Sequence, residues 1–368
     1  MIRRLYVHNF RCLENFELPI GGKPSTLLIG RNGSGKSTVG TVLELFQRIA
    51  RGTNRVGQLV QPTDFAQGRT NVPMRFEIAV TLGDDIYEYI LALDLPHLFK
   101  ELRVLEEKLT VGGKVLYART EAKVQLFGSK DTDAKFMVDE HLIALPIIQE
   151  NNKADPLSIF RTWLARMLII ALVPSRISGD AQGETLTPDR DVENFGAWLA
   201  GVLAYSPASY TQIDTYLKEV LPDFKDLKLP LIGKEFRSLS IQFQQDNAEI
   251  SLPFCDLSDG EKCFFVCAVV LVSNEAYGPL FCFWDEPDNF LSISEVSHFV
   301  RVLRRTFQKS GQLLISSHNP EAIRSFSEEN TLVLGRRSHL EPTIVRPLEE
   351  LNIEGDIVDA LIRNDVKV

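Results

Sequence analysis

One stretch of nine residues limits what this chain can fold into more than any other. Residues 30–38 read G-R-N-G-S-G-K-S-T, which matches the phosphate-binding pattern G-x-x-x-x-G-K-[S/T]. The five residues before it, S-T-L-L-I, predict a short buried strand, and residues 39–51 place apolar side chains at helical spacing. A chance glycine-rich turn would not need these flanks. Phosphate binding does, because the helix presents its positive N-terminal end to the anion.

The pattern assigns roles within this loop. Glycines let the backbone turn tightly, so that its N–H groups can face phosphate oxygens. Lys36 would reach the β- and γ-phosphates, and Ser37 would hold Mg²⁺. The residues expected to contact the nucleotide are Gly30, Arg31, Asn32, Gly33, Ser34, Gly35, Lys36, Ser37 and Thr38. ATP and Mg²⁺ are therefore the expected ligands.

Composition indicates a soluble globular protein with reduced thiols. The chain is 44% apolar and 24% charged, and its formal charge of -9 argues against coating nucleic acid through bulk charge. We expect no membrane association, because no apolar run reaches the ~18 residues of a spanning helix. The N-terminus lacks the apolar core of a secretion signal, so a cytoplasmic location is expected. The five cysteines form no C-x-x-C pair.

The pattern of apolar residues changes along the chain. Short strand-like runs over 72–127, some separated by G-D-D and G-G, predict antiparallel hairpins. Residues 141–170 look helical, as do 192–203 and 210–220. From residue 256 onward strands alternate with helices, which implies a largely parallel sheet.

These changes predict three parts. Residues 1–60 and 230–368 would form a discontinuous α/β head with a mixed, mostly parallel sheet. Residues 61–140 would form an inserted antiparallel β-layer, and residues 141–229 a mainly helical insertion.

Two of three further motifs allow two interpretations. In L-S-D-G-E-K, residues 257–262, Ser258 and Glu261 have the spacing of a capping box, so an ordinary helix start competes with a phosphate contact from the helix N-terminus. In S-S-H-N-P, residues 316–320, His318 follows a predicted buried strand. It could stabilise a turn or contact a γ-phosphate.

The remaining motif is acidic. Residues 280–287, L-F-C-F-W-D-E-P, place Asp285 at the end of a predicted buried strand, where a phosphate-binding enzyme of this type holds Mg²⁺. Glu286 follows directly and could face the water that attacks the γ-phosphate.

Together these motifs resemble the ABC-type ATPase superfamily, with its P-loop NTPase fold, Walker A loop, signature, Walker B strand and switch histidine. The resemblance implies that Asp285 binds Mg²⁺, Glu286 is the general base and His318 is the switch histidine, with Lys36 also catalytic. It further implies that the signature caps ATP bound to a second copy. Ser258 and Gly260 would then contact nucleotide in a head-to-tail homodimer around two ATP, or in a higher homo-oligomer.

The branch of this superfamily is indicated by spacing. Lys36 and Ser258 are 222 positions apart, and the chain opens with a strand running into N-F-R-C. This resembles the RecF/SMC/OLD branch, in particular stand-alone AAA/OLD-like ATPases without a TOPRIM nuclease domain. The likeness places Arg11 near the nucleotide. Because 34 residues follow Leu334, nuclease chemistry on this chain is not expected.

The sequence departs from the family pattern at two places. The signature reads S-D-G-E instead of S-G-G-Q, so Asp259 brings a carboxylate close to the expected γ-phosphate position. After residue 288 the usual L-H-P is replaced by N-F-L-S. The Q-loop glutamine stays unassigned among Gln58, Gln61 and Gln149.

The predicted function is an ATP-driven switch that controls a partner. The partner would be a separately encoded nuclease or toxin, or DNA, and the resemblance suggests phage defence or DNA repair as the setting. One alternative is an ATP-binding scaffold with little hydrolysis, and another is a transporter's ATPase subunit, against which the 222-residue spacing speaks. Arg301, Arg304 and Arg305 on one predicted helix could contact DNA, or they could form a solvated, ion-paired face.

Overall fold

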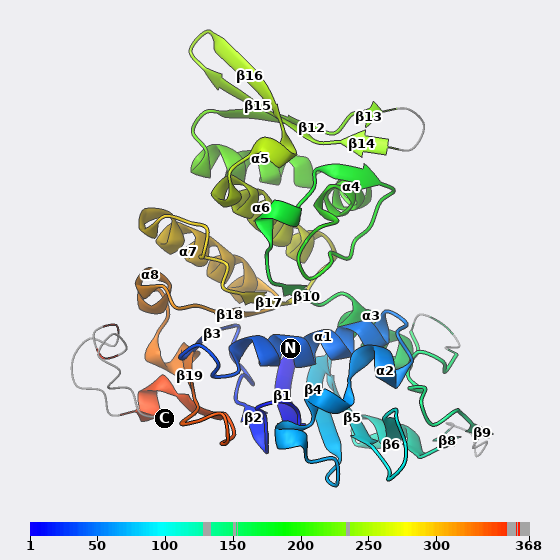
Figure 1. Cartoon of the computed structure of the whole chain (residues 1–368). Helices are drawn as coiled ribbons and strands as arrows, with labels where there is room; N and C mark the ends of the chain where they lie inside the picture. Colours follow the sequence, from blue (N-terminus) through cyan, green and yellow to red (C-terminus); the bar gives the residue numbers. More distant parts are fainter. Residues whose placement is uncertain are drawn as a thin grey trace. The chain divides into compact units, whose positions relative to one another are not determined.

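The structure is a computed structural model that describes residues 1–127, 134–149, 152, 154–232, 236–351, 358 and 360. The chain forms two compact units, Met1–Met167 with Glu328–Val368 and Leu168–Ser327 (Figure 1). Each unit is described separately below. The division into the three parts predicted from the sequence stays a prediction.

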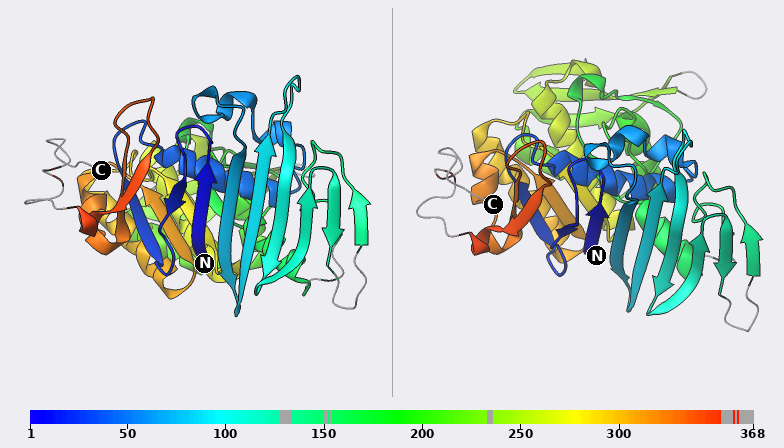
Figure 2. Two further views of the ribbon diagram at one scale, coloured as in Figure 1. Left: turned by 90° about the horizontal axis from the view of Figure 1, so that it is seen from below. Right: turned by 60° about the horizontal axis from the view of Figure 1, so that its bottom comes forward.

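The first unit contains an eight-stranded antiparallel sheet (Figure 2). From edge to edge its strands are β2 (Phe16–Leu18), β1 (Ile2–His8), β4 (Met74–Leu82), β5 (Asp85–Asp94), β6 (Arg103–Val111), β7 (Lys114–Thr120), β8 (Lys123–Leu126) and β9 (Ala134–Met137). The predicted antiparallel layer is therefore confirmed. The opening strand of the chain joins it, because β1 pairs with β4.

One face of this sheet is apolar and covered by helices. Alternate residues of β4 are buried, as a half-buried strand requires. Helices α1 (Lys36–Ala50) and α3 (Pro156–Ala165) pack there: the Tyr89 ring lies 6.0 Å from Phe46 and 5.9 Å from Phe160 between centroids. The opposite face carries ion pairs such as Arg75 with Glu77. The short helix α2 (Val56–Leu59) follows α1.

The phosphate-loop strand belongs to a second set of strands in this unit. The buried strand β3 (Ser25–Ile29) pairs in parallel with β19 (Thr331–Gly335), which pairs antiparallel with β20 (Ile344–Pro347). The predicted strand–loop–helix order around residues 30–38 is confirmed.

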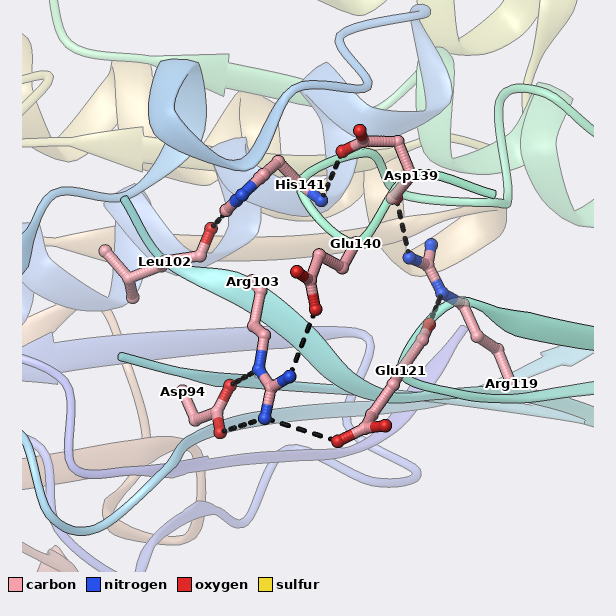
Figure 3. Close-up of polar contacts among 8 residues, drawn as sticks. All are labelled: Asp94, Leu102, Arg103, Arg119, Glu121, Asp139, Glu140 and His141. Carbon is pink, nitrogen blue, oxygen red and sulfur yellow. Dashed lines mark hydrogen bonds and ion pairs between the residues drawn. The ribbon is translucent and has the colours of Figure 1, made fainter. Parts of the chain in front are cut away.

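Residues 141–149 were expected to be helical, and this prediction is wrong: they form turns. Two of their backbone amides bond to a side chain of the sheet, and two others close a turn on the Ala144 carbonyl. The buried Glu107 carboxylate accepts hydrogen bonds from Ala144 N at 2.7 Å and Leu145 N at 2.8 Å. Arg119 donates to the Asp139 carbonyl, and His141 Nδ1 lies 3.0 Å from the Leu102 carbonyl oxygen (Figure 3). The helical signal belongs to the following α3.

The second unit has a parallel core and antiparallel additions. Strands β10 (Leu168–Ile170), β17 (Phe281–Asp285) and β18 (Gln312–Ser316) are parallel. The parallel pairing of β17 and β18 was predicted, whereas residues 168–170 were expected to be helical. The antiparallel sets are β12 (Phe224–Lys228), β15 (Ser240–Gln245) and β16 (Ala248–Pro253), and β11 (Asp180–Gln182), β14 (Phe236–Ser238) and β13 (Leu231–Ile232).

Helices of the second unit surround α6 (Asp259–Tyr277). This helix is apolar around most of its surface because it contacts α4 (Phe195–Tyr205), α5 (Ser209–Val220) and α7 (Ile293–Lys309). The Phe299 ring of α7 lies 5.4 Å from Trp284 of β17. The short helix α8 (Pro320–Arg324) follows β18.

Candidate functional site

The phosphate loop has the backbone that its glycines predict. Gly30, Gly33 and Gly35 have φ values of 150°, 79° and 104°, which other residues adopt only with strain. A Cβ at Gly30 would also lie 2.2 Å from the Leu334 carbonyl oxygen. Glycine is therefore required for β19 to run close beside the loop.

Side chains of the loop are arranged for an anion. Lys36 is buried, with Nζ donating to the Gly30 carbonyl at 2.9 Å, so the ammonium lies over the loop. The Ser34 hydroxyl is buried and has no hydrogen-bond partner within the described part of the chain. Ser37 is exposed on the first turn of α1, whose first turn carries no acidic residue. The Ser34 hydroxyl without a partner and the N-terminus of α1 without an acidic side chain both suit a bound phosphate.

Two residues that the sequence analysis did not assign to the phosphate loop support it. Thr343 Oγ1 donates to the Ser34 carbonyl at 2.9 Å, and Thr343 N donates to the Cys12 carbonyl at 2.8 Å. Cys12 Sγ lies 3.7 Å from Thr38 Oγ1. Cys12 thus brings its neighbour Arg11 to the region of the loop, where Arg11 Nε pairs with Asp64 Oδ1 at 2.8 Å. A role for Arg11 in nucleotide binding stays a prediction.

In the second unit, the acidic motif lies at the carboxyl end of parallel strands. Asp285 is the last residue of β17, and its carboxylate accepts a hydrogen bond from the Ser316 hydroxyl at the end of β18. The Glu286 N–H donates to the same hydroxyl at 3.0 Å. Glu286 adopts a left-handed φ of 49°, a conformation that a glutamate rarely takes.

The Glu286 carboxylate is held from both sides. His318 Nε2 lies 3.3 Å from Oε1, and Asn289 Nδ2 donates to Oε2 at 2.8 Å. The Glu286 side chain is 31% exposed, so solvent can still reach it. The structure therefore brings Glu286 and His318 together in this unit, while their roles stay predictions. Asn289 was noted only as part of a departure from the family pattern, and nothing in its spacing pointed to this contact.

The buried Asp288 carboxylate is a second acidic group in this turn. Ser317 Oγ donates to Asp288 Oδ2 at 2.8 Å, whereas Asp288 Oδ1 is buried without a hydrogen-bond partner among the described residues. Burial raises the pKa of Asp288, and the nearby Glu286 charge adds to this shift. Asp288 and Ser317 thus tie the segment after β17 to the segment that carries His318.

The signature begins α6 with the capping box that its sequence indicates. Ser258 Oγ accepts from Glu261 N at 3.3 Å, and Glu261 Oε2 accepts from Ser258 N at 2.7 Å. Ser258 and Asp259 are exposed, so the helix end is also open to an anion. A Cβ at Gly260 would lie 2.9 Å from the Phe290 carbonyl oxygen, which explains the glycine by a close approach of the loop after β17.

Each of the two predicted Mg²⁺ ligands has suitable chemistry. No group of three or more histidine, cysteine or acidic side chains that could hold a metal exists in the ranges that the structure describes. Mg²⁺ in nucleotide sites is bound by one or two protein oxygens together with substrate phosphates. Ser37 provides a hydroxyl of this kind in the first unit, and Asp285 provides a carboxylate in the second unit.

Comparison with known proteins agrees with these motifs. A family model described as "AAA domain, putative AbiEii toxin, Type IV TA system" matches residues 25–324. The chain belongs to this AAA family. A second AAA-domain model matches residues 4–45. The OLD nuclease of Thermus scotoductus is 49% identical over 45 residues, which cover 12% of this chain and 8% of that nuclease.

Solved structures show the fold of this AAA protein. The SMC head bound to the C-terminal winged-helix domain of ScpA superimposes with a TM-score of 0.55, at 14% identity over 95% of this chain and 99% of that one. An SMC head with an extended coiled coil, bound to the C-terminal domain of ScpA from Pyrococcus furiosus, gives a TM-score of 0.52 at 13% identity over 95% and 97%.

The predicted resemblance to ABC-type ATPases of the RecF/SMC/OLD branch is therefore confirmed: the chain belongs to an AAA family and has an SMC-head-like fold. None of the helices in the described residues is long and apolar enough to cross a membrane.

Proposed function

We propose that this AAA protein is a cytoplasmic ATP-driven switch. It binds ATP with Mg²⁺ on the phosphate loop, closes as a homodimer or higher homo-oligomer around two ATP, and reopens after hydrolysis. The closed form controls a partner, either a separately encoded nuclease or toxin, or DNA. Phage defence or DNA repair is the setting that the family suggests.

One observation carries the hydrolysis proposal: the Glu286 carboxylate is fixed by Asn289 and His318 yet remains accessible. A carboxylate so placed can accept a proton from a water molecule as that water forms a bond to the γ-phosphorus and the bond to the ADP oxygen breaks. The products are ADP and phosphate. Lys36 balances phosphate charge. Ser37 and Asp285 would hold Mg²⁺, which when bound would supply positive charge next to the phosphate oxygens.

Closure around two ATP is supported by the exposed signature. Ser258, Asp259 and the N-terminal end of α6 face solvent in one copy, so they are available to a nucleotide held by another. Ser258 and Gly260 are the residues that we assign to this contact. The Asp259 carboxylate opposes it, which favours a second candidate function, an ATP-binding scaffold with little hydrolysis.

A protein partner is supported by the names of the relatives. The family description connects the AAA domain itself with the toxin of a toxin–antitoxin system, in which two proteins act as a pair, and the two SMC heads were solved with ScpA bound. The OLD nuclease, of which this chain matches 8%, is a nuclease by its name, and this supports a nuclease as the partner.

ATP turnover of the wild type, Lys36→Ala and Glu286→Gln tests the proposal. We expect measurable hydrolysis in the wild type, and rates reduced by about 100-fold or more in both variants. Equal, near-zero rates in all three proteins, with ATP still bound by the wild type and by Glu286→Gln, would favour the scaffold instead.

A further inference from the structure

A basic cavity lies between α7 and α8 in the second unit, and the proposed function does not use it. Its volume is about 410 Å³. Its lining consists of charged and hydroxyl- or amide-bearing side chains: Ser297, Arg301, Arg304, Arg305, Gln308, Glu321, Arg324 and Ser325. We call it the arginine cavity. It has no residue in common with the phosphate loop, the signature or the Glu286 site.

The arginine cavity concentrates positive charge. Four guanidinium groups and one carboxylate give a net charge of +3, within a chain of net charge -9. Glu321 pairs with Arg324 at 2.9 Å. Arg301 donates to the Ser297 hydroxyl, and within the described residues neither Arg301 nor Arg305 forms an ion pair. An anion from solution is the missing counter-charge.

The position of Arg304 is fixed before any ligand arrives. Its guanidinium lies 4.3 Å from the centroid of the Phe326 ring and donates to the Ser325 carbonyl. Burial lowers the pKa of Arg304, which reflects a cation partly removed from water. A guanidinium held in this way loses little freedom when it binds an oxyanion.

The lining indicates what kind of anion fits. It contains no aromatic or aliphatic residue, so it offers no matching surface to an apolar group. Arginine, not lysine, provides all four cations, and the guanidinium fork matches phosphate oxygens. The volume is that of a small-molecule site, whereas specific nucleic-acid binding buries at least about 600 Å² of largely basic protein surface.

We propose that the arginine cavity binds a compact ligand with two or more linked phosphate groups. This inference goes beyond the proposed function and does not depend on ATP hydrolysis. The ligand's phosphates are bound by Arg301, Arg305 and Arg304, and its remaining part projects from the cavity.

Calorimetric titration with inorganic tripolyphosphate, without Mg²⁺, tests the proposal. Lys36→Ala serves as the background because it weakens the phosphate loop. We expect one saturable site there, and at least about tenfold weaker binding once Arg301→Ala and Arg305→Ala are added, since each removes charge-assisted hydrogen bonds. The matched control, Lys114→Ala with Lys228→Ala, removes two exposed cations that do not line the cavity and should change affinity less than about twofold.

Equal loss in the arginine pair and the lysine control, or no loss in either, would overturn the site. Arg301→Gln with Arg305→Gln replaces the alanine pair if thermal denaturation shows that the latter is misfolded.

Two further titrants identify the source of the anion: a single DNA strand of about 20 nucleotides and polyglutamate. Binding of either that is tighter than tripolyphosphate and lost in the arginine pair would overturn the compact ligand in favour of nucleic acid or an acidic protein segment. Failure of the switch would appear separately, as unchanged ATP turnover in Lys36→Ala.

Discussion

Asn289 should contribute to hydrolysis only through Glu286. Each oxygen of the Glu286 carboxylate has one partner, His318 at 3.3 Å and Asn289 at 2.8 Å. Glu286→Gln removes the base and should lower kcat by about 100- to 10,000-fold, or about 3–5 kcal/mol in activation free energy. Asn289→Ala keeps the base but removes one of its two supports. The loss of one hydrogen bond to a charged group is worth roughly 1.5 kcal/mol, so kcat should fall about tenfold.

The double variant shows whether the two residues act as one unit. If Asn289 only orients the carboxylate, the double variant should hydrolyse ATP within about threefold of Glu286→Gln alone, because there is no base left to orient. Steady-state phosphate release at saturating ATP gives the rates, and the matched control is Ser294→Ala in the same exposed region. A double variant about tenfold slower than Glu286→Gln would refute the reasoning, since Asn289 would then act independently.

Three further predictions concern charge. Glu107→Gln should lower the free energy of unfolding by about 3–5 kcal/mol in urea denaturation, because it leaves Arg119 as an unpaired charge in the core; an unchanged midpoint would contradict this. Asp259→Asn should lower the ATP concentration for half-maximal dimer formation roughly fivefold, since it removes about 1 kcal/mol of repulsion at the signature; light scattering across an ATP titration would contradict it by showing no shift. Burial raises the pKa of Asp288 above 3.8, so the ionised carboxylate destabilises the fold once the pH exceeds that raised pKa. The difference in melting temperature, Asp288→Asn minus wild type, should therefore become more positive from pH 4 to pH 8. A difference that becomes more negative would contradict this.

Local motifs predicted much of the fold and the positions of the candidate site residues. The strand before Gly30, the helix after Lys36 and the buried strand ending at Asp285 are encoded in short segments, where apolar spacing and capping residues determine the element. The capping box of α6 was evident from Ser258 and Glu261 for the same reason.

Contacts between distant residues could not be predicted in this way. Thr343 supports the carbonyl of Ser34 across 309 positions of sequence, and only the pairing of β19 with β3 brings it there. The turns of residues 141–149 were interpreted as helix because apolar residues such as Ile143 and Ile147 have helical spacing. Their amides are captured by the buried Glu107 carboxylate, which lies on a strand far earlier in the chain.

The central claim is that ATP closes one copy of this protein on another. Light scattering of Glu286→Gln, with and without ATP and Mg²⁺, tests it most directly, because the variant should bind ATP but not release the closed form. The account predicts a mass of one chain, 41.5 kDa, without ATP and a doubled mass with it, and Lys36→Ala in the same background should abolish the change. An unchanged mass of 41.5 kDa at saturating ATP would contradict the switch.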